Sequence, residues 1–170
     1  MVIKIEIGIS GSGKTTYYKN NHSENSGYIN PDSLRKQLCG DVSDQTRNRE
    51  VFELAYVNLE KFCLSGKNEI WFDATNLTKD SITKILNISS KYGYDCEFIV
   101  FEDSLNPELC NSRVRKDIEN SVDRSNVPEE IITTKQFNKF VNLYKNLENL
   151  YNEFVSDYKG IKFKITKVRG

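Results

Sequence analysis

The sequence has little histidine and no closely spaced pair of cysteines. Its 170 residues include one histidine, His22, so neither a histidine-dependent catalytic triad nor a histidine-containing zinc cluster is expected. The cysteines form no Cys-x-x-Cys pair, which removes the usual zinc and redox motifs. Three of the four lie in segments with helical or strand periodicity and are interpreted as small buried side chains. The four are Cys39, Cys63, Cys96 and Cys110.

Long apolar runs and an excess of one charge are also missing. No run approaches the roughly 20 residues that cross a bilayer, and residues 1–8 (MVIKIEIG) alternate like a strand, unlike a signal peptide. The 24 basic residues balance the 24 acidic ones, which argues against a large sequence-independent nucleic-acid surface but leaves room for a local basic pocket. We expect a cytoplasmic protein with no membrane partner, and the sequence indicates no protein partner.

The length suits a single domain over residues 1–170. Apolar alternation and helical periodicity divide the chain into strands that alternate with helices. Because buried strands joined by helices pair in parallel, the pattern predicts an α/β sheet of about five strands, covered on both faces. Strands are predicted at residues 2–7, 27–30, 69–73, 96–101 and 161–165, and helices at 14–21, from 31, 47–64, 78–92, 107–117 and from 128, the last long enough to contain a break.

Residues 8–15, GISGSGKT, fit the pattern G-x-x-x-x-G-K-[ST] and lie between a predicted strand and a predicted helix. Glycine lets the backbone turn closely around a ligand, so that amide groups and the helix N-terminus hold phosphate oxygens. Lys14 adds charge at the β- and γ-phosphates, and Thr15 offers a hydroxyl to Mg²⁺. ATP and Mg²⁺ are therefore the expected cofactors. The residues expected to bind the ATP phosphates are Ser10, Gly11, Ser12, Gly13, Lys14, Thr15 and Thr16.

Asp32 and Arg35 follow the second predicted strand, three residues apart on one face of a helix. Ligands of open α/β sheets bind at this end of the strands. There a carboxylate can accept the proton of an attacking hydroxyl, and an arginine can bind an anionic group of the acceptor. The alternative is that Asp32 complements the helix dipole and Arg35 is its solvated partner.

Asp73 ends an apolar strand, as a Walker B aspartate does, although the usual second acid is absent. We expect Asp73 in the site, and we assign it to the acceptor-binding group together with Asn76. Thr75 and Asn76 have an alternative interpretation as turn and capping residues before the next helix.

Residues 111–127 carry several basic side chains within a polar stretch. One interpretation is a solvated helix face. The other is a lid whose arginines stabilise charge on the transferring phosphoryl group. The basic residues are Arg113, Arg115, Lys116 and Arg124.

In this order, GISGSGKT, NPDSLR, FDATNLT and VDRSNVPEEII, the motifs resemble those of the polynucleotide 5′-hydroxyl kinases, the kinase modules of phage and bacterial end-healing enzymes. The resemblance runs from about residue 2 to residue 132. It implies an adenylate-kinase-like P-loop fold of three layers with an arginine-bearing lid. It also implies transfer of the ATP γ-phosphate to the 5′-hydroxyl of a DNA or RNA end.

The resemblance also implies roles for single residues. Asp32 matches the general base of the family, and Arg35 matches the contact to the phosphodiester of the acceptor. Lys14 and Thr15 match the ligands of phosphate and magnesium, and Asp73 matches the aspartate at the strand end. These roles make Lys14 and Asp32 candidate catalytic residues.

For the lid, Arg113 matches the first arginine of the family. The second commonly follows four residues later, where this chain has Asp117. Arg115 or Arg124 could take that role, and we count Arg113 and Arg124 as candidate catalytic residues.

Two other functions fit the same glycine-rich loop. A small-metabolite phosphotransferase of similar fold would use the same loop, aspartate and lid, and the neutral net charge suits it slightly. A nucleotide-dependent switch or ATPase subunit would need no acceptor. The presence of Asp32 and the lack of an adjacent Walker B acid pair argue against this last function.

Overall fold

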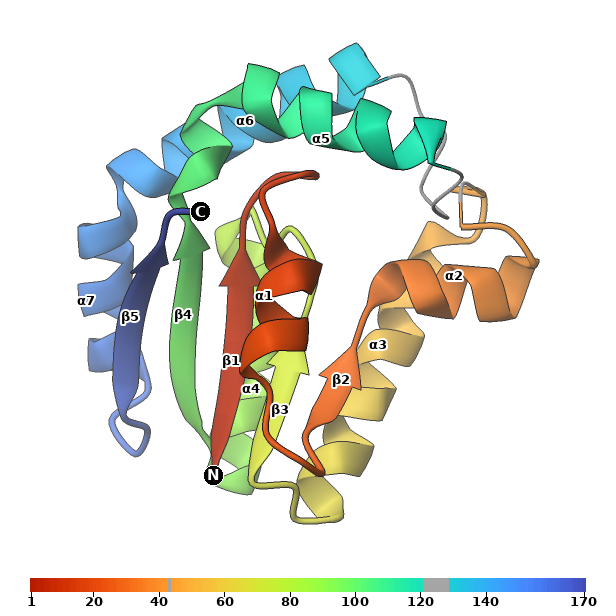
Figure 1. Cartoon of the computed structure of the whole chain (residues 1–170). Helices are drawn as coiled ribbons and strands as arrows, with labels where there is room; N and C mark the ends of the chain where they lie inside the picture. The colour runs from red at the N-terminus through yellow and green to blue at the C-terminus, as the bar shows by residue number, and fades with distance from the viewer. Residues whose placement is uncertain (43, 121–128) are drawn as a thin grey trace.

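The computed structural model describes the chain except residue 43 and residues 121–128, and it places side chains outside 121–133. Its centre is a sheet of five parallel strands in the order β2-β3-β1-β4-β5 (Figure 1). The predicted α/β class with about five parallel strands is thus confirmed. The strands are β1 Val2–Ile7, β2 Gly27–Ile29, β3 Glu69–Phe72, β4 Asp95–Phe101 and β5 Phe163–Val168.

The predicted position of the last strand is wrong by two to three residues. Ile161 belongs to the preceding turn, where its amide donates to the Tyr158 carbonyl over 3.2 Å. β5 begins at Phe163 and stays paired with β4 as far as Val168, which aligns with Phe101. Pairing with β4, and not the local alternation, therefore sets the ends of this strand.

The helices agree closely with the periodic segments. A short 3₁₀ helix, η1, was not predicted, and the break expected in the last helical region falls at Asn146. Asn30 and Thr78 cap α2 and α4 by accepting hydrogen bonds from the amides three residues on. The helices are α1 Lys14–Asn21, α2 Pro31–Cys39, α3 Asn48–Leu64, α4 Lys79–Tyr92, η1 Glu102–Leu105, α5 Pro107–Glu119, α6 Glu129–Lys145 and α7 Leu147–Asp157.

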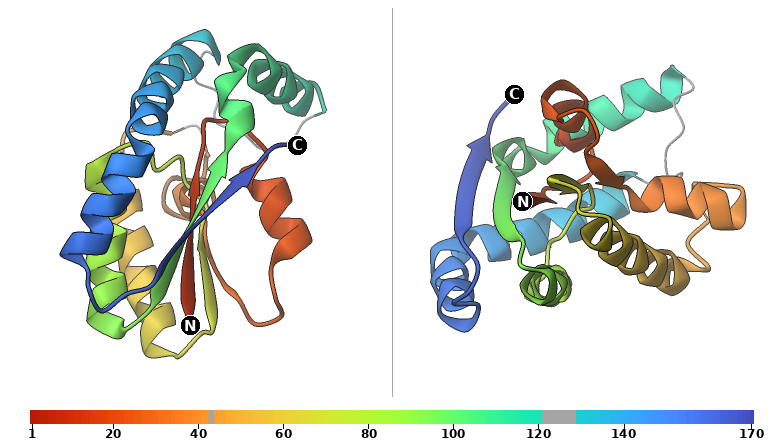
Figure 2. Two further views of the ribbon diagram at one scale, coloured as in Figure 1. Left: turned by 90° about the vertical axis from the view of Figure 1, so that its left-hand side faces the viewer. Right: turned by 90° about the horizontal axis from the view of Figure 1, so that it is seen from below.

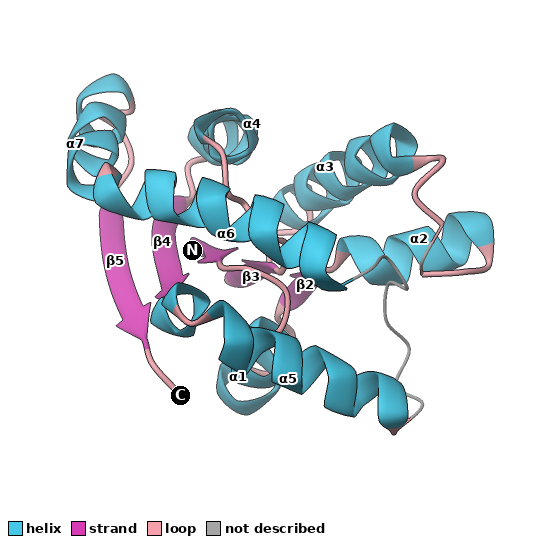
Figure 3. Cartoon of the chain, turned by 90° about the horizontal axis from the view of Figure 1, so that it is seen from above, coloured by secondary structure: helices cyan, strands magenta, loops and turns pink. Residues whose placement is uncertain are grey.

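One face of the sheet is apolar and carries the main core. Alternate residues of the central strand, Ile3, Ile5 and Ile7, point to this face and are fully buried, with Phe72 and Phe98 from the neighbouring strands. Helices α3, α4 and α7 cover it (Figures 2 and 3). The periodicity of two in the strands and of 3.6 in these helices brings their apolar sides together.

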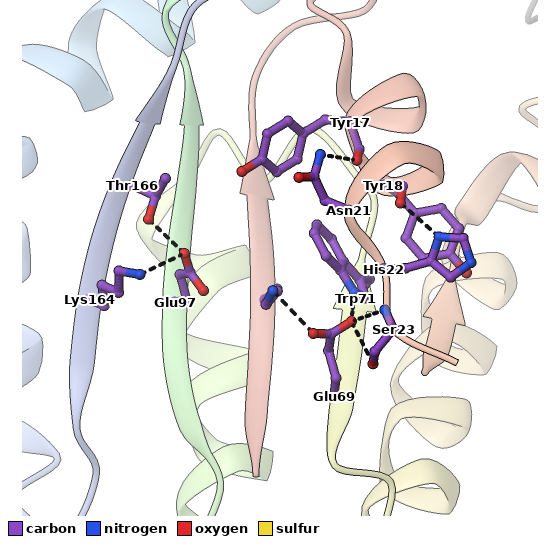
Figure 4. A network of polar contacts seen from close by, with 11 residues as sticks. Tyr17, Tyr18, Asn21, His22, Ser23, Glu69, Trp71, Glu97, Lys164 and Thr166 are labelled. Atoms are coloured by element: carbon purple, nitrogen blue, oxygen red, sulfur yellow. Dashed lines mark hydrogen bonds and ion pairs between the residues drawn. The ribbon is translucent and has the colours of Figure 1, made fainter. Parts of the chain in front are cut away.

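The opposite face carries the charged residues of the same strands, and α1 packs on it (Figures 2 and 3). Lys4 lies over the Trp71 ring, 4.5 Å from its centre, and its ammonium group is 3.1 Å from Glu69. Tyr17 of α1 packs against Trp71, and Figure 4 shows Glu69 and Glu97 within networks of polar contacts on this face. The two sides of one sheet thus differ in chemistry.

Two helices, α5 and α6, cross the carboxyl ends of the strands above the loop that follows β1, and we call these two helices the arch (Figures 1 and 3). The start of α2 lies at the same edge of the sheet. Among the described residues, no helix is both long enough and apolar enough to span a membrane.

Candidate active site

The glycine-rich loop joins β1 to α1. Gly11 and Gly13 have φ angles of 80° and 100°, which other residues rarely adopt. A Cβ atom on Gly11 would lie 2.3 Å from the carbonyl oxygen of Cys110, so α5 leaves no room for a side chain there. No side chain caps α1 at Gly13. The first amides of this helix are therefore suited to receive an anion.

Lys14 folds back over the loop that precedes it. Its Nζ donates to the carbonyl oxygens of Gly8 and Ile9 over 3.1 and 2.9 Å. The ammonium group is thereby held inside the curve of the loop, where phosphate oxygens bind in P-loop proteins. The role of Lys14 in binding phosphate stays a prediction.

Asp73 lies directly after β3 and is 4% exposed. Its Oδ2 accepts hydrogen bonds from the Thr15 hydroxyl (2.8 Å), the Tyr28 hydroxyl (2.6 Å) and the Asn30 amide (3.0 Å). Burial first, and then the charge of Asp73, raise the pKa of Tyr28, so this hydroxyl stays a donor. Asp73 thus contacts Thr15 at the start of α1, and none of its hydrogen bonds within the described residues involves Arg35, with which it was grouped.

Glu6 was not predicted to be part of the site. It is fully buried on the charged face of the central strand, and among the described residues neither carboxylate oxygen has a hydrogen-bond partner. Because Ile5 aligns with Phe72, Glu6 stands beside Asp73. Burial raises the pKa of Glu6 to about 10, helped by the charge of Asp73 and by a hydrogen bond between the two carboxyl groups, while Lys14 lowers it.

The two observations on Glu6 agree once its proton is considered. Two ionised carboxylates only accept hydrogen bonds, so neither can satisfy the other. A proton on Glu6 would supply the missing donor to Asp73. The sequence held one signal for this residue, a charge in the interior of a strand that proves to be central, where both faces are covered.

Asp32 and Arg35 form an ion pair on α2. Arg35 Nη1 donates to Asp32 Oδ1 over 2.5 Å, and Arg35 Nη2 donates to the Asn48 side-chain oxygen over 2.7 Å. The Arg35 side chain is 6% exposed, whereas that of Asp32 is 57% exposed. A buried arginine thus holds a carboxylate that faces solvent. Asn48, the first residue of α3, was missed because it is distant in sequence.

Asn76 occupies a different place from the one predicted. It has a φ of 47° and is 3% exposed. Its amide nitrogen donates to the Glu6 carbonyl over 2.7 Å. The side chain joins the ends of two strands, which corresponds to the turn role given above as the alternative. We therefore withdraw the expected contact between Asn76 and the acceptor.

Arg113 reaches the loop from α5, so residues 111–119 of the expected lid are helical. Its Nη1 donates to the Gly11 carbonyl over 3.1 Å, and its Nη2 donates to Asp103 over 2.8 Å. Gln136 of α6, which was not predicted, accepts from the Ser10 amide over 2.8 Å. The arch therefore contacts the loop from both of its helices. Arg124 and the rest of residues 121–127 of the expected lid lie outside the described residues.

The oxygen atoms around Thr15 suit a magnesium ion. Mg²⁺ prefers hard oxygen ligands and is commonly held by one or two carboxylates together with phosphates of the substrate. The Thr15 hydroxyl, Asp73 and the unpartnered carboxylate of Glu6 supply such oxygens. No group of three or more His, Cys, Asp or Glu residues that could hold a metal occurs in the described part of the chain.

A comparison with protein families finds a match over most of the chain. The model of a family described as AAA domain matches residues 4–139. No curated protein sequence matches the chain.

A comparison with solved structures finds chains that resemble this one in fold. A chain of the Pnkp1/Rnl/Hen1 RNA repair complex superposes with a TM-score of 0.66 at 17% identity, over 85% of this chain and 45% of that one. A chain of a second Pnkp1/Rnl/Hen1 complex gives 0.53 at 25% identity, over 64% and 37%. The APS kinase CysC of Mycobacterium tuberculosis, solved with AMPPNP and APS, gives 0.40 at 17%, over 70% and 71%. The chain thus spans less than half of either Pnkp1/Rnl/Hen1 chain, and the resemblance to end-healing kinase modules is confirmed for the fold.

Proposed function

Because the chain belongs to the AAA domain family of P-loop proteins, we propose that it is an ATP-dependent kinase acting on polynucleotide 5′-hydroxyl ends in the cytoplasm. The observation that carries the proposal is the pair on α2, in which a buried arginine holds a solvent-facing carboxylate at the edge of the sheet that also carries the glycine-rich loop. A nucleotide-dependent switch needs no such pair. A kinase needs both a phosphate cradle and a proton acceptor.

On the donor side, the amides of residues 10–16 and Lys14 bind the phosphates of ATP. Thr15 and Asp73 hold Mg²⁺, which neutralises charge on the β- and γ-phosphates when it is bound. The hydrogen bonds from Tyr28 and Asn30 fix the Asp73 carboxylate beside Thr15. The cradle is thus in place before the nucleotide arrives, which spares the enzyme reorganisation during the reaction.

On the acceptor side, Asp32 accepts the proton of the attacking 5′-hydroxyl. The hydroxyl oxygen forms a bond to the γ-phosphorus, the bond from that phosphorus to the β,γ-bridging oxygen breaks, and ADP leaves with the electron pair. Arg35 holds Asp32 and binds the phosphodiester of the acceptor. Asn48 fixes the guanidinium of Arg35 through its second nitrogen.

Arginines above the loop stabilise the charge that develops on the transferring phosphoryl group. Arg113 already contacts the loop at the Gly11 carbonyl. We assign it as the first arginine of the lid and keep Arg124 as the candidate for the second. Such arginines act by electrostatic stabilisation of the transition state.

The choice of a polynucleotide acceptor rests on two supports. The first is that the motifs resemble those of end-healing kinases. The second is that two similar solved chains belong to Pnkp1/Rnl/Hen1 complexes, one of which is described as an RNA repair complex. The competing acceptor is a small alcohol, which the neutral net charge favours because no extended basic surface is needed.

The substitution Asp32→Asn, which removes the charge but keeps the shape of the side chain, tests the proposed role of Asp32 as the general base. In Asp32→Asn, transfer of labelled γ-phosphate to a 5′-hydroxyl oligonucleotide should fall at least about 100-fold, while ATP binding is kept. The matched control is Asp80→Asn, since Asp80 is the second residue of α4 as Asp32 is of α2, and its side chain is 88% exposed. Equal turnover in the two variants would remove Asp32 as the base.

A further inference from the structure

Glu6 is an acidic residue that the proposed reaction does not use. It lies in the central strand, it is fully buried, and both of its carboxylate oxygens lack a partner among the described residues. A buried carboxylate without a partner is costly, and apolar residues fill the other buried positions of β1. Its presence therefore calls for a compensating ligand or proton.

The surroundings of Glu6 indicate which ligand fits. Asp73 stands beside it, directly after the neighbouring strand β3, and Asp73 in turn accepts a hydrogen bond from Thr15 over 2.8 Å. Two carboxylates and one hydroxyl thus meet beneath the start of α1. This set of hard oxygens suits a small divalent cation, which would replace the missing partner of Glu6.

We propose that Glu6 is the second carboxylate of the divalent-cation site beneath the glycine-rich loop, where with Asp73 and Thr15 it binds the cation before the nucleotide does. The inference rests on the cation site of the proposed function and adds a residue to it. Walker B motifs usually place a second acid directly after the aspartate, where this chain has Ala74. Here the adjacent strand supplies the acid.

The competing role for Glu6 is that of a permanently protonated acid that only donates a hydrogen bond to Asp73. The two roles predict different results for the Glu6→Gln variant. The side-chain amide that Glu6→Gln introduces would still donate to Asp73, so a purely structural role survives this substitution. An amide carries no charge and binds Mn²⁺ or Mg²⁺ poorly, so the cation role does not survive.

The test measures binding of Mn²⁺ to the nucleotide-free protein through the paramagnetic resonance signal of the unbound ion. The native chain should bind one Mn²⁺, and Glu6→Gln should weaken this binding at least about tenfold. The control is Glu97→Gln, because Glu97 lies on the same face, in β4, and pairs with Lys164 and Thr166 away from the loop. This control should bind Mn²⁺ as the native chain does.

Unchanged Mn²⁺ binding in Glu6→Gln, or no binding by the native chain without nucleotide, would overturn the inference. Circular dichroism verifies that the Glu6→Gln variant is folded. If that variant does not fold, Glu6→Leu, which also removes the charge, takes its place in the measurement. No acceptor and no ATP are present in the measurement. A chain that binds Mn²⁺ through Glu6 but phosphorylates no polynucleotide therefore keeps this inference and loses the proposed acceptor.

Discussion

The two faces of the sheet are built from the same strands but carry different side chains, apolar on one face and charged on the other. On one face Ile3, Ile5 and Ile7 pack under α3, α4 and α7. On the other face, which α1 covers, Lys4 lies over Trp71 and Glu6 stands beside Asp73. Burial of the apolar side chains on the first face stabilises the fold. Burial of the charged side chains on the second face destabilises it.

The difference between the two faces agrees with the proposed place of the active site. Charge on the second face becomes more buried towards the carboxyl end of β1, from Lys4, whose side chain is 18% exposed, to Glu6, which is fully buried. Next to Glu6 stand Asp73 and the glycine-rich loop. Residues that oppose stability thus gather at the edge where P-loop proteins bind phosphate, which is typical of active sites.

The largest expected effect is that of Lys14→Ala on phosphoryl transfer. Loss of the ammonium group that the loop holds should lower the rate at least about 1000-fold, because transition-state charge is left without its counter-charge. Lys4→Ala removes a lysine from the charged face of β1, further from the loop than Glu6, and should leave the rate nearly unchanged. Both rates are measured with γ-labelled ATP. Equal losses would show that the active region is not confined to one end of that face.

The next prediction compares how much each face contributes to the free energy of unfolding. Phe98→Ala on the apolar face should lower the free energy of unfolding by about 3–5 kcal/mol through a cavity in the core. Glu97→Gln, one residue away on the other face, should lower it by about 1 kcal/mol or less, because its partner Lys164 is 70% exposed. Urea unfolding measures both. Similar losses would mean that the second face contributes to stability as a core does.

Arg113→Ala tests the arch. The rate of transfer should fall about 10- to 100-fold, since the guanidinium is assigned to charge stabilisation. Urea unfolding should show a loss of about 1–3 kcal/mol as well, because the buried carboxylate of Asp103 loses its ion-pair partner. The exposed Lys116 lies three residues further along α5, and Lys116→Ala should be neutral in both measurements. An unchanged rate in Arg113→Ala would move the role to another arginine.

The smallest effect concerns pH and Glu6 in metal-free protein. The pKa of Glu6 is raised from 4.5 to about 10, so between these pH values the unfolded chain is ionised while the folded chain keeps the proton. The native chain therefore loses stability as pH rises, and Glu6→Gln should gain about 1–3 kcal/mol over it at pH 8 but little at pH 4.5. Thermal unfolding in EDTA at the two pH values measures the gain. A gain of equal size at both would contradict the assigned burial of a proton.

Much of this arrangement could be predicted from local patterns. The loop at residues 8–15, the pair Asp32 and Arg35, and four of the five strands were predicted because each depends on neighbours in sequence. The fifth strand was misplaced because pairing with β4 sets its ends.

The rest of the site depends on contacts across the fold. Asn48 and Gln136 join it through hydrogen bonds to Arg35 and to the Ser10 amide, over long separations that no motif records. Glu6 lies in a segment that alternates apolar and charged residues, and this alternation does not tell which strand becomes central. Only the strand order reveals that its charge is buried.

The most direct test of the account is the identity of the acceptor. The native chain is incubated with γ-labelled ATP, Mg²⁺ and DNA or RNA oligonucleotides that carry either a 5′-hydroxyl or a 5′-phosphate, and small alcohols are tested in parallel. The account predicts label at the 5′ end of the hydroxyl oligonucleotides and none on those already phosphorylated. Label on a small alcohol alone, or release of free phosphate without transfer, would contradict it.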